Sequence, residues 1–377
     1  PGGGVNPLRG QNTVQGACDM GGLPNVFPRY QKVADEKSRS KFAEAWSLSG
    51  PSDFALPTST GLTITEMTEA AGNGSIRGLY ILGENPVLTD PDTNHVRSCL
   101  DRAEFVVLQE IFPSETSEYC DVLLPGTTFA ERNGTFTNTE RRVQLFRQAI
   151  PHHAISRPDW SITQELATSI LERTHREPAG PQAGWDFNSP ADIMDEIATL
   201  TPSYAGVSHS RLDDGERLQW PVLDANHPGT PILHVNEFAR GKGLFHPVDH
   251  LEPNELPDDE FPLLLTTGRV LYHWHGGEMT RRSEGLNEVC PESFIEISAI
   301  DARVCGIEEN AELTVTSRRG TMHARAAITD RVTPGLLFGN FHFPGSHNVN
   351  ILTNPALDPA AKIPEYKVCA VRIAALT

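Results

Sequence analysis

The stretch IRGLYIL at residues 76–82 is followed by TNHVRSCLDR at residues 93–102 and by EFVVLQ at residues 104–109. The first and third stretches are short and mainly apolar, which is typical of buried strands, and the middle stretch predicts a helix. Short strands that alternate with helices predict a parallel, Rossmann-like sheet. The sequence lacks the G-x-G-x-x-G pattern, so a standard dinucleotide site is not indicated.

The α/β pattern continues on the C-terminal side of this core. Asp121–Leu124 predicts a third short strand, which Pro125 and Gly126 end. A long helix is predicted over Pro158–Arg173, and a weaker one near Ala191–Leu200.

After an acidic linker at Glu252–Glu260 the pattern changes to short strands. The predicted strands are Phe261–Thr267, Phe294–Ser298, Glu312–Ser317, Thr321–Thr329, Leu336–Gly339 and Val368–Ile373. Apolar residues alternate at period two in the third and fourth of them, as in half-buried strands. A short helix over Ala299–Cys305 is predicted to end at Gly306. The fold class is therefore α/β, with a parallel sheet followed by a small C-terminal β-barrel.

Composition restricts the class of function. The chain has 377 residues, a formal net charge of −18 and a pI near 5.2. Such acidity argues against a nucleic-acid surface and against anionic membranes, and a small anionic substrate would need a local cation. No apolar run approaches the roughly 18–20 residues of a transmembrane helix. The start at Pro1 without a Met resembles the inside of a longer protein, so the true N-terminus is not seen. We expect a cytoplasmic protein and leave periplasmic export open.

Cysteines give no metal-binding pattern in the sequence. None of the six is spaced as C-x-x-C, so neither a zinc ribbon nor an iron–sulfur motif is indicated. Their scatter predicts buried thiols in a reducing compartment.

Four segments, in order along the chain, resemble the molybdopterin oxidoreductase family and in particular the catalytic subunits of formate dehydrogenases. They resemble an active-site loop (Gly4–Asn12 and Gln15–Gly21), strand-end loops (Gly83–Pro86 and Val107–Phe112), a pterin-binding loop (Thr267–His275 with Met279–Arg282) and a closing strand (Pro364–Val371). The resemblance implies a bis-molybdopterin guanine dinucleotide cofactor with molybdenum or tungsten. It also implies that the barrel is of the aspartate-decarboxylase-like, double-psi type.

The resemblance further implies how the chain is organised. Residues 1–30 would be an active-site loop segment that completes an absent N-terminal domain, 31–175 an α/β cofactor-binding domain, 176–258 an irregular connection and 259–377 the barrel. The absent N-terminal half would carry a 4Fe-4S cluster, the Cys or selenocysteine on the metal and an adjacent His. No residue of this chain is expected to ligate the metal, and Cys18 lies inside a family pattern in which it is structural.

The implied activity is oxidation of formate to carbon dioxide, or the reverse, with iron–sulfur or NAD-linked subunits as electron-transfer partners. This chain alone is expected to be inactive. Two alternatives remain: another bis-pterin oxidoreductase such as a nitrate reductase, and a non-catalytic subunit that keeps the fold inside an electron-transfer complex.

Arg9 is the predicted substrate residue, with Gln11 nearby. Formate is a bare carboxylate, and a guanidinium offers two parallel N–H donors that a Lys lacks. The resemblance implies that Arg9 orients formate. The alternative is an exposed loop arginine.

Cofactor contacts are predicted mainly at the sheet edge and in the pterin-binding loop. The paired N–H donors of guanine suit a carboxylate, and the family pattern puts acids at Glu110 and Asp159, although Asp159 could instead be a helix N-cap. Arg132 matches a phosphate-contacting position, with a solvated Arg as its alternative. His273 and His275 could form an H-x-H metal pair, but no third ligand lies at a recognisable spacing. The full predicted set is Gly83, Glu84, Asn85, Gln109, Glu110, Arg132, Asp159, Thr267, Gly268, Arg269, His273, His275, Gly276, Thr280, His342, Asn350 and Lys367.

Overall fold

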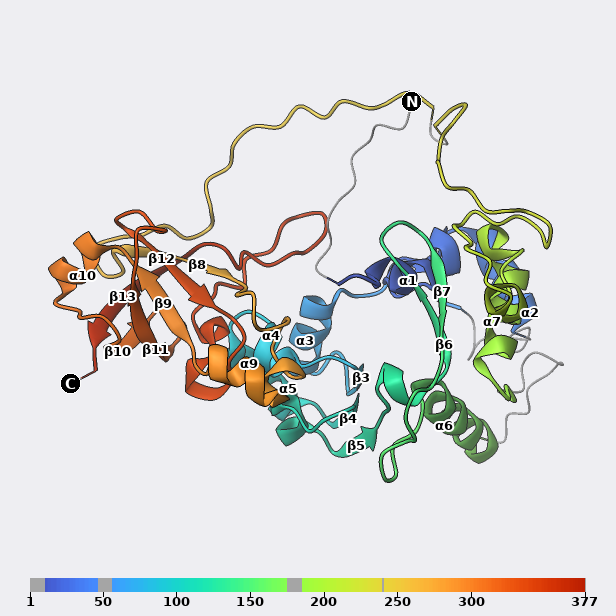
Figure 1. Ribbon diagram of the computed structural model, residues 1–377, viewed down its shortest axis with the longest axis horizontal. Coiled ribbons are helices and arrows are strands. Elements are labelled where there is room, and N and C mark those ends of the chain that lie inside the picture. Colours follow the sequence, from blue (N-terminus) through green and yellow to red (C-terminus); the bar gives the residue numbers. More distant parts are fainter. Residues whose placement is uncertain (1–10, 47–55, 175–184, 239–240, 377) are drawn as a thin grey trace. The chain divides into compact units, whose positions relative to one another are not determined.

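The computed structural model describes residues 11–46, 56–174, 185–238 and 241–376. The chain divides into two compact units, each built from segments that are distant in sequence (Figure 1). The first unit comprises residues 1–63 and 125–247, and the second comprises residues 64–124 and 248–377. The predicted division into domains follows chain order instead, and it stays a prediction.

A small parallel sheet lies in the second unit. Its strands are β3 (Gly78–Leu82), β4 (Phe105–Glu110) and β5 (Val122–Pro125), in the order β3-β4-β5. β3 and β4 pair in parallel, with Gly78 opposite Phe105 and Leu82 opposite Gln109, which confirms the predicted pairing.

Three helices accompany this sheet: α3 (Ile64–Gly72), α4 (Pro86–Thr89) and α5 (Thr93–Arg102). The helix α5 begins where the Asp92 side chain accepts a hydrogen bond from the His95 N–H. Leu79 and Ile81 of β3 pack against a buried cluster of Val87, Val96 and Leu100. The alternate residues Tyr80 and Leu82 point to the opposite face and are exposed.

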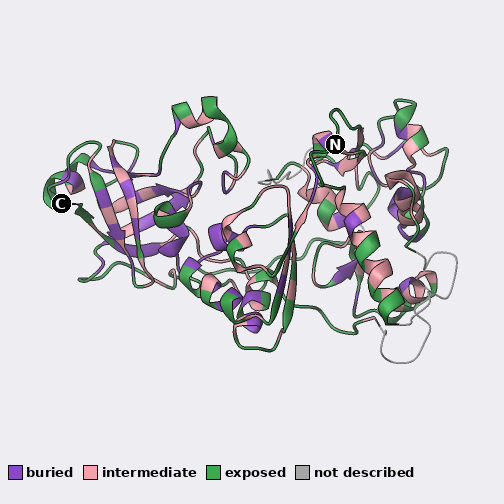
Figure 2. Ribbon diagram, turned by 90° about the horizontal axis from the view of Figure 1, so that it is seen from below, coloured by how far each residue is buried: buried purple, intermediate pink, exposed green. Residues whose placement is uncertain are grey.

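Six strands close into a barrel in the same unit, as predicted. They are β8 (Leu263–Gly268), β9 (Phe294–Ile297), β10 (Glu312–Thr316), β11 (Thr321–Ile328), β12 (Leu336–Asn340) and β13 (Cys369–Ala375). The order around the barrel is β10-β11-β9-β12-β8-β13, with parallel pairs β9/β11 and β8/β12. Leu313, Val315 and Met322 point inward at period two and are fully buried, so that the barrel holds the main core of the unit (Figure 2).

Two further helices belong to the barrel region, α9 (Glu284–Val289) and α10 (Ala299–Cys305). The Ser298 side chain caps α10 at its start, and Gly306 ends it with a φ of 65°. A left-handed residue of this kind satisfies the last carbonyls of a helix at little cost when it is Gly. The predicted helix and its glycine cap are therefore confirmed.

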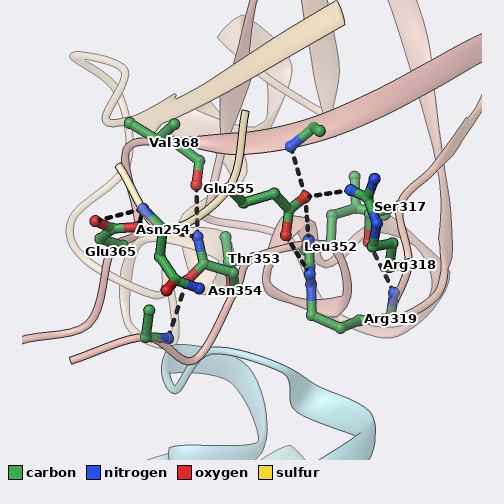
Figure 3. Close-up of polar contacts among 12 residues, drawn as sticks. Asn254, Glu255, Ser317, Arg318, Arg319, Leu352, Thr353, Asn354, Glu365 and Val368 are labelled. Atoms are coloured by element: carbon green, nitrogen blue, oxygen red, sulfur yellow. Dashed lines mark hydrogen bonds and ion pairs between the residues drawn. The ribbon is translucent and has the colours of Figure 1, made fainter. Parts of the chain in front are cut away.

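The acidic linker is held to the barrel by Glu255. Its carboxylate contacts the guanidinium of Arg319 at 2.5 Å and that of Arg318 at 3.3 Å (Figure 3). The same carboxylate accepts a hydrogen bond of 2.8 Å from the backbone N–H of Ala370, at the start of β13. Only 11% of the Glu255 side chain is exposed, and its contacts attach the linker to β13 and to the segment between β10 and β11.

Within the second unit, side-chain amides join the sheet region to the barrel region. The Asn350 amide donates to the carbonyls of Leu88 and Thr89, and the Asn348 amide donates to the carbonyl of Val87. The Tyr366 hydroxyl adds a hydrogen bond of 3.1 Å to the Thr89 carbonyl. These bonds fix α4, and with it the sheet edge, against the barrel.

The first unit is mixed. Its elements are α1 (Val14–Asp19), β1 (Val26–Phe27), β2 (Gln31–Lys32), α2 (Glu36–Ala45), β6 (Gly134–Thr137), β7 (Val143–Phe146), α6 (Asp159–Arg173), α7 (Pro190–Leu200) and α8 (His209–Asp213). The helices α6 and α7 confirm two predicted helices. The antiparallel hairpin β6–β7 was not predicted; it packs through Val143 against a cluster that includes Tyr204 and Trp220. Over the described residues, no helix combines the length and apolar character needed to cross a bilayer.

Candidate functional site

Three carboxylates gather where β3 and β4 end. Glu84 follows β3, Glu110 ends β4, and Glu278 comes from the loop after β8. Burial raises the pKa of Glu84, and the charge of Glu278 raises it further. Burial also raises the pKa of Glu110, and this effect and the charges of Glu278 and Glu84 outweigh the hydrogen bond from the Ile111 N–H. We call Glu84, Glu110 and Glu278 the acidic edge. Glu84 as a residue is exposed.

Asn85 connects the acidic edge to its surroundings. Its amide nitrogen donates to Glu278 at 3.0 Å and to Glu115 at 2.7 Å. Its amide oxygen accepts from the hydroxyl of Thr116 at 2.8 Å and from the backbone N–H of the same residue. Asn85 is buried, so these bonds fix the strand-end loop against the 3-10 helix η3 (Glu115–Tyr119) and against the loop after β8.

Two buried polar residues lie beneath the acidic edge. Gln109 is 1% exposed, and its side chain accepts a hydrogen bond from the Tyr80 hydroxyl. Asp90 is 7% exposed; burial, followed by the charge of Glu84, raises its pKa to about 7. An acid in this state binds a proton near neutral pH.

Two cations converge at the barrel end of the same unit. The Lys367 ammonium donates to the Thr267 carbonyl at 2.6 Å, and the Arg269 guanidinium lies 5.7 Å from the centre of the Phe341 ring. Burial, and then the charge of Arg269, lowers the pKa of Lys367. In the part of the chain that the structure describes, neither cation has a carboxylate within ion-pair distance. We call Arg269 and Lys367 the basic corner.

His342 holds the loop that connects these two groups. It is fully buried, donates from Nδ1 to the His275 carbonyl and accepts at Nε2 from the Val270 N–H at 2.9 Å. Burial lowers the pKa of His342 to about 4, so the ring is neutral at physiological pH. This tautomer uses both ring nitrogens to set the backbone of residues 270–275.

His273 and Thr280 stabilise the same loop from within. His273 is 3% exposed; its Nε2 donates to the Cys290 carbonyl at 2.7 Å and its Nδ1 accepts from the Thr280 hydroxyl at 3.2 Å. The Thr280 hydroxyl also accepts from the Trp274 N–H. The His275 ring instead lies 3.3 Å from the Arg269 guanidinium.

Two glycines allow the close packing of this loop. A Cβ at Gly268 would lie 2.4 Å from the Phe338 ring, and one at Gly276 would lie 2.4 Å from the Glu278 carboxylate. Any side chain there would push one of these groups away. Gly83 serves a different need, because its φ of 66° turns the chain after β3.

The remaining predicted residues either have partners of their own or fall outside these groups in the structure's division into units. The Asn350 amide is used by the carbonyls of α4. Arg132 and Asp159 belong to the first unit, where they form an ion pair with each other at the start of α6. Gln11 is exposed, and Arg9 lies outside the described residues.

The sequence-based prediction did not include Glu278, Asp90 or Tyr366. A signal existed for Glu278, since it is the only acid in the glycine-containing loop 267–280. No comparable signal marks Asp90, whose raised pKa follows from its burial in the folded chain.

Two segments of the chain match models of known domain families. Residues 1–169 match the molybdopterin oxidoreductase model, and residues 263–370 match the molydopterin dinucleotide binding domain model. The second match runs from β8 to the start of β13, so it includes the loop with Arg269 and Glu278 as well as Lys367.

Individual relatives match nearly the whole chain. The F420-dependent formate dehydrogenase subunit alpha of Methanocaldococcus jannaschii is 48% identical over 373 residues, covering 98% of this chain and 52% of that protein. Formate dehydrogenase H of Escherichia coli is 36% identical, covering 99% of this chain and 50% of that protein. This chain thus spans about half the length of these relatives. Among solved structures, acetylene hydratase from Pelobacter acetylenicus has the same fold, with a TM-score of 0.60 at 11% identity over 90% of this chain and 50% of that one.

The parallel sheet, the closed barrel and both family matches agree with the resemblance seen in the sequence. The chain belongs to the molybdopterin oxidoreductases, and its most similar relatives named here are alpha subunits of formate dehydrogenases.

Proposed function

We propose that the full-length protein is a molybdenum- or tungsten-dependent formate dehydrogenase, and that this chain supplies much of its site for a bis-molybdopterin guanine dinucleotide. The observation that carries the proposal is the acidic edge and the basic corner, joined by one loop within one compact unit. The acidic edge brings negative charges close together, and the basic corner brings positive charges close together. Neither group neutralises the other. A ligand with donors at one end and negative charge elsewhere would relieve both repulsions.

The described residues fit the dinucleotide part of this cofactor. The paired N–H donors of guanine suit the carboxylates of Glu84 and Glu110. The pyrophosphate suits the side chains of Arg269 and Lys367 together with backbone N–H groups of residues 268–276. The glycines at 268 and 276 would permit the close approach that such backbone contacts require.

Arg9 is proposed to orient formate, on the strength of the resemblance of its loop. Oxidation of formate yields carbon dioxide, one proton and two electrons, and the bound metal–pterin group would accept the electrons. The role of Arg9 is to hold both oxygens and so direct the C–H bond, for which the planar guanidinium fork is suited. Gln11 is proposed to lie beside it.

Further partners are proposed for the full-length protein. A 4Fe-4S cluster and the Cys or selenocysteine on the metal would come from a part of the protein outside this sequence. Relatives at 43–48% identity carry the name F420-dependent formate dehydrogenase. This similarity favours an F420-linked electron-transfer subunit over an NAD-linked one, and a cytoplasmic location is proposed with it.

The test uses the purified full-length protein. Mild acid hydrolysis should release guanine nucleotide, and formate should reduce a viologen dye. Arg9→Lys keeps the charge but loses the fork, so kcat/KM should fall by about 10²–10³ while the nucleotide content stays constant. Arg173→Lys, at an exposed position at the end of α6, is the matched control. Near-normal formate oxidation by Arg9→Lys would refute the assigned role, and reduction of nitrate without formate oxidation would favour the alternative oxidoreductase.

A further inference from the structure

Three side chains of types that can bind a metal ion lie close together on the helices α3 and α5. Glu69 comes from α3, whereas His95 and Cys99 are four residues apart on α5 and therefore share one helical face. The His95 Nε2 lies 2.7 Å from a Glu69 carboxylate oxygen and 3.4 Å from the Cys99 sulfur. All three ligand atoms lie within 4.8 Å of one another.

These distances suit a small tetrahedral ion. Zinc binds Cys sulfur, His nitrogen and carboxylate oxygen at about 2.0–2.3 Å, which places ligand atoms of one tetrahedron roughly 3.3–3.8 Å apart. The sulfur–nitrogen distance already falls in this range, and the nitrogen–oxygen pair needs to open by less than about 1 Å. A donor set of thiolate, imidazole and carboxylate suits zinc, whereas magnesium and calcium prefer oxygen ligands.

We propose that Glu69, His95 and Cys99 form a three-ligand zinc site, with water as the fourth ligand. The Cys99 side is closed, because this residue is buried. The other side is open, because 43% of the His95 side chain and 61% of the Glu69 side chain are exposed. An incoming ion and a water ligand therefore have a path to the site.

The packing of α3 leaves room for the thiol. A Cβ at Gly72, the last residue of α3, would lie 2.4 Å from the Cys99 sulfur. Any other residue at this position would require the Cys99 side chain to shift. Arg102 opposes the ion, since its guanidinium lies 3.9 Å from the sulfur. It is exposed and can turn into solvent when the metal binds.

A zinc ion here would link α3 to α5, and both helices belong to the unit that contains the sheet and the barrel. Its binding would require loss of the Cys99 proton and a neutral His95, so affinity should fall as the pH falls. The site is separate from the acidic edge and the basic corner, and it does not depend on the proposed formate chemistry.

The test is zinc binding to the purified full-length protein after treatment with a chelator. Equilibrium dialysis with metal analysis should give one zinc ion per chain, and zinc should raise the melting temperature. Cys99→Ser, His95→Gln and Glu69→Gln should each weaken binding by at least about tenfold, since even loss of an outer-shell partner costs about 10–100-fold. Cys305→Ser, which changes an exposed cysteine of the same unit, should leave it unchanged.

Two further measurements keep the result interpretable. Zinc X-ray absorption should show one sulfur among nitrogen and oxygen neighbours, and Gly72→Ala should weaken binding by displacing the thiol. His95→Gln should melt at the wild-type temperature in chelator, which separates loss of the site from misfolding. Absence of stoichiometric zinc, or equal binding by wild type and all three ligand variants, would overturn the proposal.

Discussion

Within the second unit, folding shifts the pKa of Glu255 and the pKa values of Glu84 and Glu110 in opposite directions. Burial alone would raise the pKa of Glu255, but hydrogen bonds from Arg319 and the Ala370 N–H, and the charges of both arginines, outweigh it and lower the pKa. The pKa values of Glu84 and Glu110 are raised instead, because burial and neighbouring acids act on them without a compensating cation. The acid that holds the linker to the barrel is paired within the protein, whereas those at the acidic edge are left for a ligand to satisfy.

The cations of the unit repeat this contrast. Arg318 and Arg319 are paired with Glu255, and Arg318 also with Asp258. Arg269 and Lys367 contact only an aromatic ring, a histidine ring and a carbonyl among the described residues. Charges with internal partners should therefore govern stability, and charges without them should govern binding. Three substitutions test this division, and a fourth, at the buried Asp90, tests how burial of an acid without a cation affects stability.

Glu255→Gln should give the largest effect. It removes the negative charge beside two arginines, and breaking a buried ion pair costs about 3–5 kcal/mol of unfolding free energy. The carboxyl group has a lowered pKa in the folded state, so its stabilisation is present above the ordinary value of 4.5 and is lost as the pH falls below it. Denaturant unfolding against pH measures both quantities. Glu260→Gln removes an exposed acid of the same linker and is the control; equal losses in the two variants would contradict the role of Glu255.

Asp90→Asn should raise the free energy of unfolding near neutral pH, whereas Glu255→Gln lowers it. The pKa of Asp90 rises from 3.8 to about 7 on folding, so the folded state binds the extra proton and stability falls as the pH rises between these values. Because a tenfold change in proton affinity corresponds to about 1.4 kcal/mol, the variant should be more stable than wild type by on the order of 4 kcal/mol at about pH 8. Melting temperatures measured across the pH range should converge near pH 4. A variant less stable at about pH 8 would show that the ionised carboxylate has a favourable partner.

The folding pattern was largely predictable where the signals are local. The strands β10 and β11 alternate apolar residues at period two, and α10 ends at a left-handed glycine, so both are visible in the sequence. The hairpin β6–β7 is different. Its turn contains Arg141 at a φ of 67°, a conformation that Gly or Asn usually marks, and its support comes from residues beyond position 200. Tertiary packing therefore specifies this hairpin, and the local sequence does not.

The site was predictable in its residue types more than in its contacts. The position of Glu84 and Glu110 after parallel strands follows from the strand pattern, because such strands end at one edge. The bond from Asn85 to Glu278 joins residues 193 positions apart, and no spacing rule predicts it. Similarly, His342 was expected to face the cofactor, but its two ring nitrogens bond to the loop backbone. Its contribution to any ligand is therefore to position residues 270–275.

Lys367→Gln should weaken binding of a diphosphate without destabilising the fold. A hydrogen bond to a charged group contributes about 1.5–3 kcal/mol, so affinity for GDP should fall by roughly 10- to 150-fold in cofactor-free protein. Affinity for guanosine, which lacks phosphate, should not change. Calorimetric titration with both ligands separates the two effects. Equal loss for GDP and guanosine would show that Lys367 acts on the base end or on the fold.

Glu110→Gln should give the smallest effect and the most specific one. A carboxylate offers two acceptor oxygens to the paired N–H donors of guanine, whereas an amide offers one acceptor and one donor, which suits adenine. The variant should therefore bind GDP about 5- to 10-fold more weakly relative to ADP, the difference expected for one ordinary hydrogen bond of about 1–1.5 kcal/mol. In the wild type this preference should also decline as the pH falls through the raised pKa of Glu110, since the protonated acid loses an acceptor. The preference of the variant should not depend on pH in that range. Glu104→Gln is the matched control, because Glu104 precedes the same strand, is exposed and pairs with Arg77 away from the acidic edge. If Glu110→Gln and Glu104→Gln gave the same ratio of GDP to ADP affinity, guanine would have to be recognised elsewhere, and the acidic edge would have to serve a cation instead.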